Sequence, residues 1–285
     1  MHKVLVTGAS GQLGSEIRQI SSAYPLEFIF TDVAELDITD REAVWSYFQT
    51  NQVDAVVNCA AYTAVDRAET EAELADKVNH LAAKYLAEAA KEFNAKFVHI
   101  STDYVFDGES FQPYEADSTP NPQSIYGVTK LAGEQAVLAQ KLSDSIVIRT
   151  SWVYSSFGNN FVKTMRRLAA ERTELNVVAD QIGTPTYARD LARCILDILP
   201  SLSNSQTAVY HYSNEGVCSW YDFATAVMEL SGLPCQVNPI PSSDYPTPAK
   251  RPYYSVLSKT KIKNEFEIKI NHWRISLQQC LADLA

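Results

Sequence analysis

The stretch KVLVTGASGQLGSEI, residues 3–17, decides the fold, because it joins a strand-like apolar run to a glycine-rich turn and an amphipathic helix pattern. Gly8, Gly11 and Gly14 follow the strand and enter the helix, where backbone N–H groups point outward. Those donors and the helix dipole suit a pyrophosphate, and the third glycine lets helix and strand pack closely. Because the glycine spacing has a strand before it and a helix after it, it predicts a dinucleotide-binding turn.

The rest of the first half repeats the alternation of strand-like and helix-periodic segments. Apolar runs occur in LEFIFTD, DAVVNCA, KFVHIS and SIVIRTS, and helical patterns cover residues 40–50 and 124–142. This order predicts an α/β fold, a Rossmann-like doubly wound parallel sheet. The pattern loosens after Tyr154, so we expect a Rossmann domain over residues 1–154 and a smaller, mainly substrate-binding region over 155–285. A helix near 188–199 is a candidate to pack back on the first domain.

Composition excludes several classes of protein. The 285 residues carry a net charge of -10 without clustered Lys and Arg, which argues against a nucleic-acid partner. Five scattered cysteines without a CxxC pair suggest neither disulfides nor zinc, and fit a reducing cytoplasm. No run of about 18 apolar residues is present, so we expect no membrane span or signal peptide.

The choice of dinucleotide depends on residues near the second strand. Asp32 ends that strand, where a carboxylate can accept hydrogen bonds from the adenosine ribose and repel a 2′-phosphate. Gln12 stands where an arginine could meet that phosphate, which favours NADH over NADPH, although Arg18 and Arg41 leave the choice open. Softer candidates for the cofactor site are Ser10, Leu13, Asp37, Ile38, Asn58, Ala60, Ala61, Tyr62 and Asn79, the last through support of the catalytic lysine.

SIYGVTK contains the candidate catalytic pair. Tyr126 and Lys130 are four residues apart, on one face of the expected helix, and Thr102 ends a strand just upstream. Reducing a ketone needs hydride at carbon and a proton at oxygen, which a positioned phenol can supply. An ammonium about 4 Å away at an effective dielectric of about 20 stabilises the phenolate by about 4 kcal/mol, so we expect Lys130 to draw the pKa of Tyr126 towards neutrality. Lys130 can also hold the nicotinamide ribose, and Thr102 the carbonyl oxygen.

Seven motifs along the chain, TGASGQLG, NCAAYTAVDRAE, STDYVFDG, YGVTK, RTSWVY, DQIGTPT and RPYYSVL, together resemble the dTDP-4-dehydrorhamnose reductases, which are extended short-chain dehydrogenase/reductases. The resemblance implies reduction of the 4-keto group of dTDP-6-deoxy-L-lyxo-4-hexulose to dTDP-L-rhamnose with NADPH or NADH. It implies Thr102, Tyr126 and Lys130 as the catalytic set, with Tyr126 as proton donor. The residues that it suggests for the sugar-nucleotide site are Asp103, Tyr104, Phe106, Trp152, Asn160 and Arg251. Without the resemblance, a tryptophan at a strand end such as Trp152 is more often packed in the core, and Arg251 beside Pro252 is open to plain solvation.

Related activities stay open as alternatives. Tyr104 replaces the glutamate that dehydratases of the superfamily place after the Thr-Asp pair, and no cysteine lies between Cys59 and Cys194 for an epimerase-reductase of the GDP-fucose synthase type. A non-catalytic subunit like the regulatory subunit of methionine adenosyltransferase, and a nucleotide-sugar 4-epimerase, remain alternatives. Some family members are dimers that bridge magnesium through acidic residues. Glu16 is the one candidate ligand, which is weak evidence for magnesium, so we expect no metal but leave magnesium open. A homodimer is left open as well.

Overall fold

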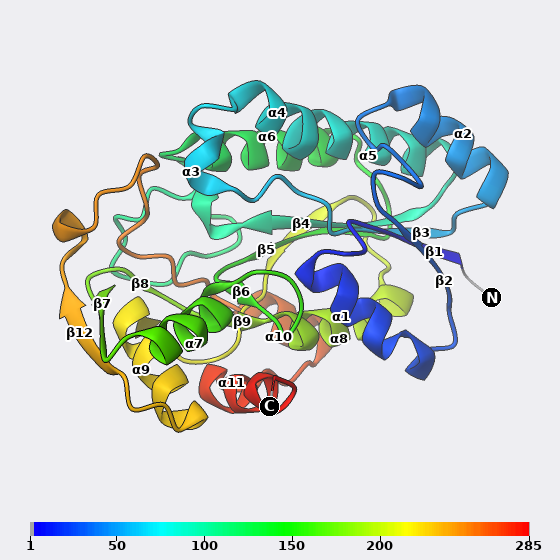
Figure 1. The fold of residues 1–285 in the computed structure, drawn as a ribbon. Coiled ribbons are helices and arrows are strands. Elements are labelled where there is room, and N and C mark those ends of the chain that lie inside the picture. Colours follow the sequence, from blue (N-terminus) through cyan, green and yellow to red (C-terminus); the bar gives the residue numbers. More distant parts are fainter. Residues whose placement is uncertain (1–2, 285) are drawn as a thin grey trace.

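A six-stranded parallel sheet forms the centre of the molecule in the computed structural model, which describes residues 3–284 (Figure 1). Its spatial order is β10-β5-β4-β3-β1-β2, and the pairs between neighbouring strands are all parallel. The strands are β1 (Lys3–Thr7), β2 (Glu27–Thr31), β3 (Ala55–Asn58), β4 (Lys96–Thr102), β5 (Ser145–Thr150) and β10 (Ala208–His211). The predicted doubly wound parallel sheet is therefore confirmed.

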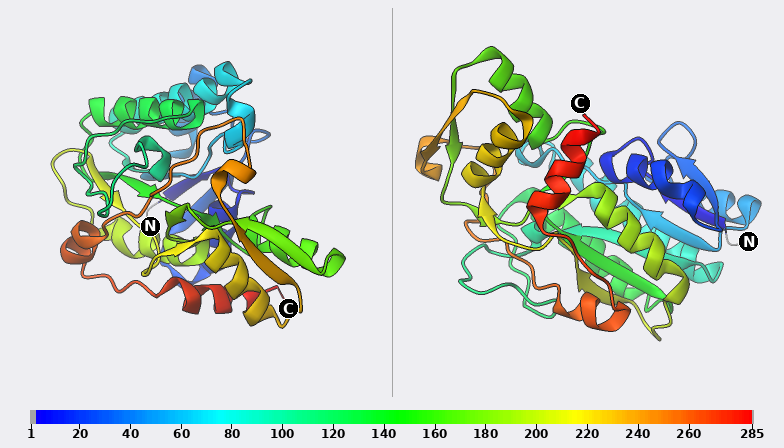
Figure 2. Two further views of the ribbon diagram at one scale, coloured as in Figure 1. Left: turned by 90° about the vertical axis from the view of Figure 1, so that its left-hand side faces the viewer. Right: turned by 90° about the horizontal axis from the view of Figure 1, so that it is seen from below.

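Helices cover both faces of this sheet, as Figures 1 and 2 show. One face packs against α1 (Gln12–Ile20) and α8 (Ala188–Ile198). The other packs against α2 (Arg41–Asn51), α5 (Ala82–Glu92) and α6 (Ile125–Ala139). A short run, α3 (Val65–Ala68), α4 (Ala72–Asp76) and the π-helix η2 (Lys77–Leu81), leads into α5.

Capping residues fix where several helices begin and end. Asp40 accepts hydrogen bonds from two backbone N–H groups at the start of α2, and Ser124 accepts one from Gly127 at the start of α6. Helix α9 (Trp220–Ser231) begins with a capping box of Ser219 and Asp222. It ends at Gly232 in the left-handed conformation that glycine adopts without strain. The Ser124 cap therefore stabilises the first turn of α6, which carries Tyr126.

The remaining chain builds a smaller region at the carboxyl edge of the sheet (Figure 1). Its elements are β6 (Val153–Tyr154), α7 (Phe161–Glu171), β7 (Glu174–Val178), β8 (Ile182–Gly183), β9 (Thr186–Tyr187), β11 (Cys218–Ser219), α9, β12 (Gln236–Ile240) and α11 (Trp273–Ala282). Helix α10 (Thr260–Phe266) instead packs on β10 of the central sheet. Short 3-10 turns occupy Ser21–Ala23, Asp103–Val105, Leu199–Ser201 and Ser242–Asp244. Within residues 3–284, no helix has both the length and the apolar character needed to cross a bilayer.

The expected boundary at residue 154 does not follow the edge of the sheet. Strand β10 pairs with β5, and α8 buries Leu191 and Ile195 in the core that it shares with α1. Both elements come from the second half of the chain, so residues beyond 154 complete the central sheet and the helical layer on one of its faces. The outer ends of the two expected regions, residues 1–2 and 285, lie outside the described residues.

The two faces of the sheet differ in polarity. Towards α1 and α8 the strands present buried apolar side chains throughout: Val4, Val6, Ala55, Val57, Val98, Ile146, Ile148 and Tyr210. Towards α2, α5 and α6 they begin apolar, with Leu5, Val56, Phe97 and Val147. Nearer their carboxyl ends, the same face carries a buried polar row of Thr7, Asn58, His99, Ser101, Arg149 and His211.

Residues 249–258, here called the tie segment, hydrogen-bond to both parts of the molecule. Tyr254 N–H donates to Gly108 on the sheet side, while Ile182 N–H of β8 donates to Tyr253 and Ser255 N–H donates back to Ile182. Gly108 has a φ of +80°, and a Cβ there would lie 2.5 Å from the Cα of Pro252, so the loop after β4 needs glycine for this contact. The tie segment thereby fixes the smaller region against the end of β4.

Candidate active site

The glycine turn is shaped for close approach of a dinucleotide. A Cβ on Gly8, whose φ is +63°, would lie 2.7 Å from the Cα of Ala60, and one on Gly14 would overlap the Gly8 carbonyl oxygen. Gly11 caps α1 without a side-chain hydrogen bond, which leaves backbone N–H groups of the first turn free to face a phosphate. These features fit a pyrophosphate on the turn.

Asp32 directly follows β2 as expected, whereas Gln12 is placed differently from the expectation. The Asp32 Oδ2 atom accepts hydrogen bonds from Ser10 N at 2.9 Å and Ser10 Oγ at 2.5 Å, so this carboxylate holds the turn itself. Gln12 reaches across to the smaller region, where its Oε1 accepts a hydrogen bond from Asn160 and its Nε2 donates to the carbonyl of Val153. The argument for NADH that rested on Gln12 is therefore wrong, because Gln12 faces residues 153–160.

The softer cofactor candidates divide into two groups. Leu13 and Ile38 point into the apolar cores on either side of the sheet, and Asp37 accepts hydrogen bonds from Thr39 at the surface. Their side chains therefore have structural partners. Asn79, in the π-helix, does hold the loop after β3: it accepts from Tyr62 N and donates to the Tyr62 carbonyl and to Thr129. It contacts Thr129, the neighbour of Lys130, and its expected support of that lysine through backbone or water stays a prediction.

That loop contains Ala60 and Ala61 together with Tyr62. Ala60 lies against Gly8, so the loop borders the glycine turn at the carboxyl ends of β1 and β3. The Tyr62 hydroxyl donates to Glu71 at 2.5 Å. Asn58, just before the loop, accepts a hydrogen bond from Thr7 and lies 3.1 Å from His99, so it belongs to the polar row under the turn.

Thr102, Tyr126 and Lys130 converge at the end of β4. Thr102 is the last residue of the strand, and Tyr126 lies in the first turn of α6 with its phenol within hydrogen-bonding reach of the Thr102 hydroxyl. Lys130 follows one turn later and donates from Nζ to the carbonyl of Ile100 at 2.6 Å. Tyr104 packs edge-on against Tyr126 with ring centroids 5.4 Å apart. The structure thus brings together three side chains from two segments.

The pKa of the phenol moves opposite to the expectation. Burial raises the pKa of Tyr126 to about 12; the Thr102 hydroxyl partly opposes this, and the charge of Asp103 adds to it. The prediction that Lys130 draws this pKa towards neutrality is wrong, because desolvation dominates and the ammonium is directed to the Ile100 carbonyl. Tyr126 is therefore a protonated phenol at neutral pH.

Lys130 of α6 is buried beside the polar row of the sheet. Burial lowers its pKa to about 8, opposed by the carboxylate of Glu134, one turn further along α6. Glu134 in turn accepts hydrogen bonds from Ser101 at 2.9 Å and from Arg149 Nε at 3.0 Å. Burial and the nearby Lys130 both lower the pKa of His99. Lys130 thus has a neutral His99 and the Glu134 side chain as neighbours.

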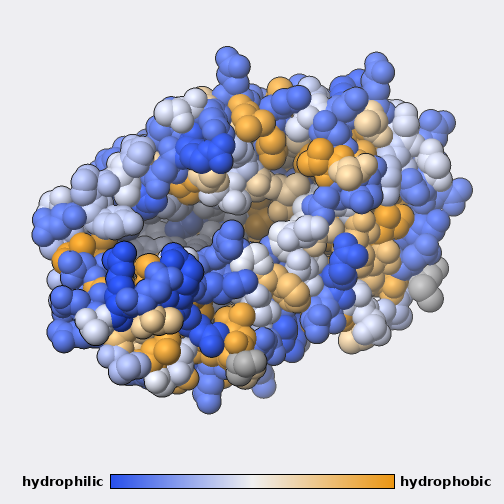
Figure 3. Space-filling view, viewed as in Figure 1, coloured by the Kyte–Doolittle hydropathy of each residue, from blue (hydrophilic) through white to orange (hydrophobic). Residues whose placement is uncertain are grey.

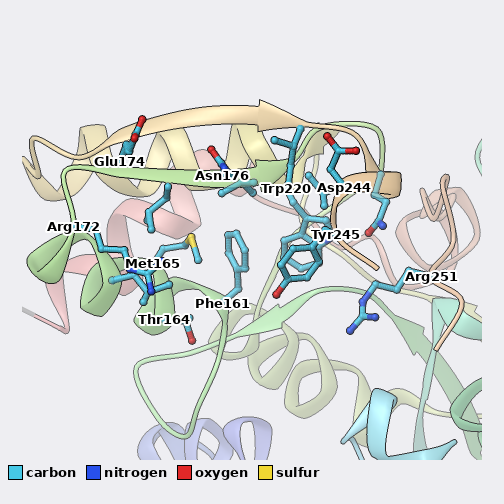
Figure 4. Close-up of a pocket in the computed structure, with 16 residues that line it drawn as sticks. Phe161, Thr164, Met165, Arg172, Glu174, Asn176, Trp220, Asp244, Tyr245 and Arg251 are labelled. Carbon is cyan, nitrogen blue, oxygen red and sulfur yellow. The ribbon is translucent and has the colours of Figure 1, made fainter. Parts of the chain in front are cut away.

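A pocket of about 800 Å³ lies between α7, α9, β7 and β12 (Figure 4). Figure 3 shows the hollow between this smaller region and the helices above the sheet. In Figure 4, Phe161, Met165, Trp220 and Tyr245 point into the space, and Arg251 lies at one end. Arg251 acts on the pKa of Tyr104, which contacts Tyr126, so this end of the pocket adjoins the catalytic residues.

The expected sugar-nucleotide residues take several positions. Trp152, with a φ of +50°, stacks on Trp220 at 3.6 Å between centroids, beside the pocket. Asn160 caps α7 and bonds to Gln12, which links the smaller region to the glycine turn. Phe106 is buried and stacks on Tyr114 at 4.2 Å, so its side chain belongs to the core under the loop and does not reach the pocket.

Asp103 is the other expected sugar contact that is enclosed by protein. Its side chain is only 2% exposed, and its Oδ1 accepts a hydrogen bond from the Thr102 hydroxyl at 3.0 Å. Burial raises the pKa of Asp103 to about 6, although hydrogen bonds from Thr102 and Ser255 oppose this. Asp103 therefore contacts a catalytic residue, and its position argues against direct contact with a sugar.

Two features of the site were not predicted from the sequence. Arg251 is paired with Asp66 of α3 through two hydrogen bonds, of 2.9 and 2.8 Å, so it is neither free nor simply solvated. YTAVDRAE marked this segment, but no local pattern joins residues 185 positions apart. Phe161, Met165 and Trp220 were also missed, because their apolar helical spacing equally fits a core.

Glu16 does not fit a magnesium ion. It is fully buried, and its carboxylate accepts hydrogen bonds from Ser155 at 2.6 Å and Arg189 at 2.8 Å. Arg189 also pairs with Asp283 of the carboxyl-terminal turn at 2.6 Å. The guanidinium occupies the position of the compensating positive charge, and residues 3–284 hold no cluster of metal-ligating side chains.

Comparisons with known proteins match this chain over nearly its whole length. A family model described as RmlD substrate binding domain matches residues 1–285. The chain is 45% identical over 284 residues to the spore coat polysaccharide biosynthesis protein SpsK of Bacillus subtilis strain 168, covering 99% of this chain and 98% of that protein. It is 41% identical over 295 aligned positions to dTDP-4-dehydrorhamnose reductase of Aggregatibacter actinomycetemcomitans, covering 99% of each. A crystal structure of dTDP-4-dehydrorhamnose reductase from Bacillus anthracis in complex with NADP has a TM-score of 0.93 and 37% identity, covering 99% of each chain.

Proposed function

Because the chain belongs to the RmlD family of dTDP-4-dehydrorhamnose reductases, we propose that it reduces the 4-keto group of dTDP-6-deoxy-L-lyxo-4-hexulose to give dTDP-L-rhamnose. This product is a precursor of surface polysaccharides, which agrees with the name of the relative SpsK. One observation carries the proposal: Thr102, Tyr126 and Lys130 meet at the end of β4, next to a pocket with a paired arginine at its near end.

The cofactor that we propose is NADPH or NADH. The glycine turn, the free first turn of α1 and the loop of Ala60 to Tyr62 offer the surface for a dinucleotide, and the B. anthracis relative was solved with NADP. A bound reduced nicotinamide supplies the hydride. Lys130 has three donors and uses one on the Ile100 carbonyl, so two remain to orient ribose hydroxyls and the phenol.

The proton comes from Tyr126 in this proposal. A pKa of about 12 keeps the phenol protonated until its proton is needed at the sugar oxygen. Tyr104 contacts the ring of Tyr126 and closes one side of the site, which limits access of water. Arg251, held in a fixed orientation by Asp66, presents its charge towards the pocket, where a diphosphate is the complementary group.

A coupled assay tests this function. Loss of NADPH or NADH absorbance is measured after addition of dTDP-4-keto-6-deoxyhexose together with the epimerase that prepares the substrate, with UDP-linked sugar as the comparison. We expect turnover with the dTDP sugar. Tightly held NAD without net consumption would indicate an epimerase, and absence of turnover with both dinucleotides would indicate a non-catalytic subunit.

Localisation and assembly are the remaining proposals. We place the enzyme in the cytoplasm, where reduced dinucleotide and nucleotide sugars are made, without a nucleic-acid or membrane partner. A homodimer stays open, and sedimentation of the purified protein measures it directly. Because Glu16 is already paired with Arg189, we expect the same assembly with and without a metal chelator.

A further inference from the structure

The Thr102 hydroxyl has more partners than it has hydrogens. Its Oγ1 accepts a hydrogen bond from Tyr104 N at 3.2 Å and donates its single hydrogen to Asp103 Oδ1 at 3.0 Å. The phenol of Tyr126 lies within reach of the same oxygen. In the role proposed above, that one hydrogen is also needed by the sugar carbonyl oxygen. Asp103 and the sugar oxygen therefore compete for it.

Asp103 is placed to decide this competition. Its side chain is buried behind Thr102, so it reaches the reaction through that hydroxyl. An ionised carboxylate accepts a hydrogen bond far more strongly than a neutral carbonyl, and would keep the Thr102 hydrogen. A protonated carboxyl no longer needs that hydrogen and can itself donate to Thr102, which frees Thr102 to donate elsewhere.

We propose that Asp103 is a positioning residue whose protonation state sets the direction of the Thr102 hydroxyl, and so decides whether Thr102 can donate to the sugar carbonyl oxygen. The inference rests on the proposed function and deepens it by assigning a pH-dependent element to the site. No bond is made or broken by Asp103, and the proton delivered to the sugar still comes from Tyr126.

The groups around Asp103 are few. Tyr104 in its own 3-10 turn and Tyr126 on α6 are the titratable side chains that its charge acts on, and both are protonated at neutral pH. Ser255 of the tie segment contributes an uncharged hydroxyl. Arg251 acts on Tyr104 and is paired with Asp66. Asp103 is thus the group of this cluster that changes charge near neutrality.

The direction of the effect follows from the sign of the titration. Burial raises the pKa of Asp103 to about 6, so protonated Asp103 becomes the main form as the pH falls through that value. Ionised Asp103 also raises the pKa of Tyr126, which makes the phenol a weaker acid. Both effects slow the reaction above the Asp103 pKa, and both are relieved below it.

The experiment measures kcat against pH for the full chain in the coupled assay. For the unmodified enzyme we expect kcat to rise as the pH falls through the Asp103 pKa and then to level off. Asp103→Asn, which mimics the protonated side chain, should give a flat profile between about pH 5 and 7, below the Lys130 pKa of about 8, and exceed the unmodified enzyme at about pH 7 by about fivefold. A flat profile for the unmodified enzyme, or an unchanged pH dependence in Asp103→Asn, would overturn the inference.

Two further variants keep the test sharp if Asp103→Asn folds poorly. Ser255→Ala removes a hydroxyl that lowers the Asp103 pKa, so the transition should move to higher pH with both plateaus unchanged. Asp107→Asn is the matched control, since Asp107 bonds to Tyr114 in the same loop and should leave the profile as it is. A Ser255→Ala profile identical to that of the unmodified enzyme would contradict the inference.

A readout without turnover separates this inference from the proposed function. Infrared difference spectra of the unmodified protein and Asp103→Asn isolate the band of the protonated carboxyl. We expect that band at about pH 5 and its loss by about pH 8. Absence of the band at low pH would overturn the inference even in an active enzyme, whereas lack of turnover at every pH would overturn the function.

Discussion

The two faces of the central sheet come from alternate residues of the same strands, yet they end differently at the carboxyl edge. Towards α1 and α8, Val6, Val57 and Ile148 keep the surface apolar. Towards α6, the adjacent residues Thr7, Asn58 and Arg149 are polar and buried. Burying polar groups costs free energy unless every hydrogen bond is made, so the second face is the less stable way to build a core.

The difference indicates that the apolar face provides stability and that the polar face provides the surroundings of the catalytic residues. The apolar face has the packing expected of a sheet that only needs to be covered. On the polar face, His99 of the sheet and Lys130 and Glu134 of the covering helix α6 are ionisable side chains that a purely structural core would not contain. Substitutions on the apolar face should lower the free energy of unfolding and leave kcat unchanged. Substitutions of the catalytic residues beside the polar face should lower kcat with little loss of stability.

The largest effect is expected from Tyr126→Phe. Removing a positioned proton donor should lower kcat by about 10²-fold or more, while dinucleotide binding persists because the ring and its contact with Tyr104 remain. Steady-state kinetics and a dinucleotide titration measure the two properties. Tyr253→Phe, at an exposed position, is the control and should behave as the unmodified enzyme. Activity near the original level would show that Tyr126 is not the acid.

Leu191→Ala tests the apolar face. Leu191 of α8 is fully buried against α1 and the sheet, so its truncation should lower the free energy of unfolding by about 2–5 kcal/mol. Under conditions in which the variant stays folded, kcat should be unchanged. Urea denaturation followed by circular dichroism gives the first quantity. A large fall in kcat in the fully folded variant would break the proposed separation of the two faces.

Lys130→Met tests the polar face, where we expect turnover to fall and stability at neutral pH to be kept. The pKa of Lys130 is about 8 in the folded protein against 10.5 for an ordinary lysine, so charging this side chain costs the folded state roughly 3 kcal/mol at neutral pH. Because the folded protein binds fewer protons than the unfolded chain between these values, its stability rises with pH across that window. The variant should lose turnover and dinucleotide affinity but unfold no more easily at neutral pH, and its stability should lack this rise. A clear loss of stability would mean that the hydrogen bond to Ile100 outweighs the burial of charge.

Arg251→Lys should have the smallest effect. A lysine keeps the charge but loses the two-point pairing with Asp66, so KM for the nucleotide sugar should rise by about tenfold with little change in kcat. Arg274→Lys, whose arginine pairs with Glu229 at the surface, is the matched control. An unchanged KM would remove Arg251 from the substrate site.

Much of the fold could be predicted because its signals are local. Buried parallel strands read as short apolar runs, and KVLVT, KFVHIS and SIVIRTS are found as β1, β4 and β5. AVYHYSN also contains a strand, but its pairing with β5 could not be foreseen, since no local pattern specifies which strand lies beside it. The π-helix at Asn79 likewise arises from packing, where Gly133 of α6 lets the two helices approach closely.

The candidate site was predictable in residue type more than in energetics. Spacing placed Tyr126 and Lys130 on one helical face, and the strand end supplied Thr102. The prediction for the pKa of Tyr126 was wrong because this pKa depends on desolvation by segments that are distant in the sequence. The position of Lys130 four residues away does not reveal how deeply the phenol is buried. The pairs Arg251 with Asp66 and Glu16 with Arg189 were invisible for the same reason, as each joins residues more than 170 positions apart.

The tie segment also bears on how the molecule is made. Residues 249–258 come near the end of the chain, yet Ser255 and Tyr254 complete the surroundings of β4, which is synthesised much earlier. A nascent chain can therefore form its nucleotide fold during translation while the catalytic corner is still open. The emerging polypeptide acquires its finished reaction chamber only after residues 249–258 have left the ribosome.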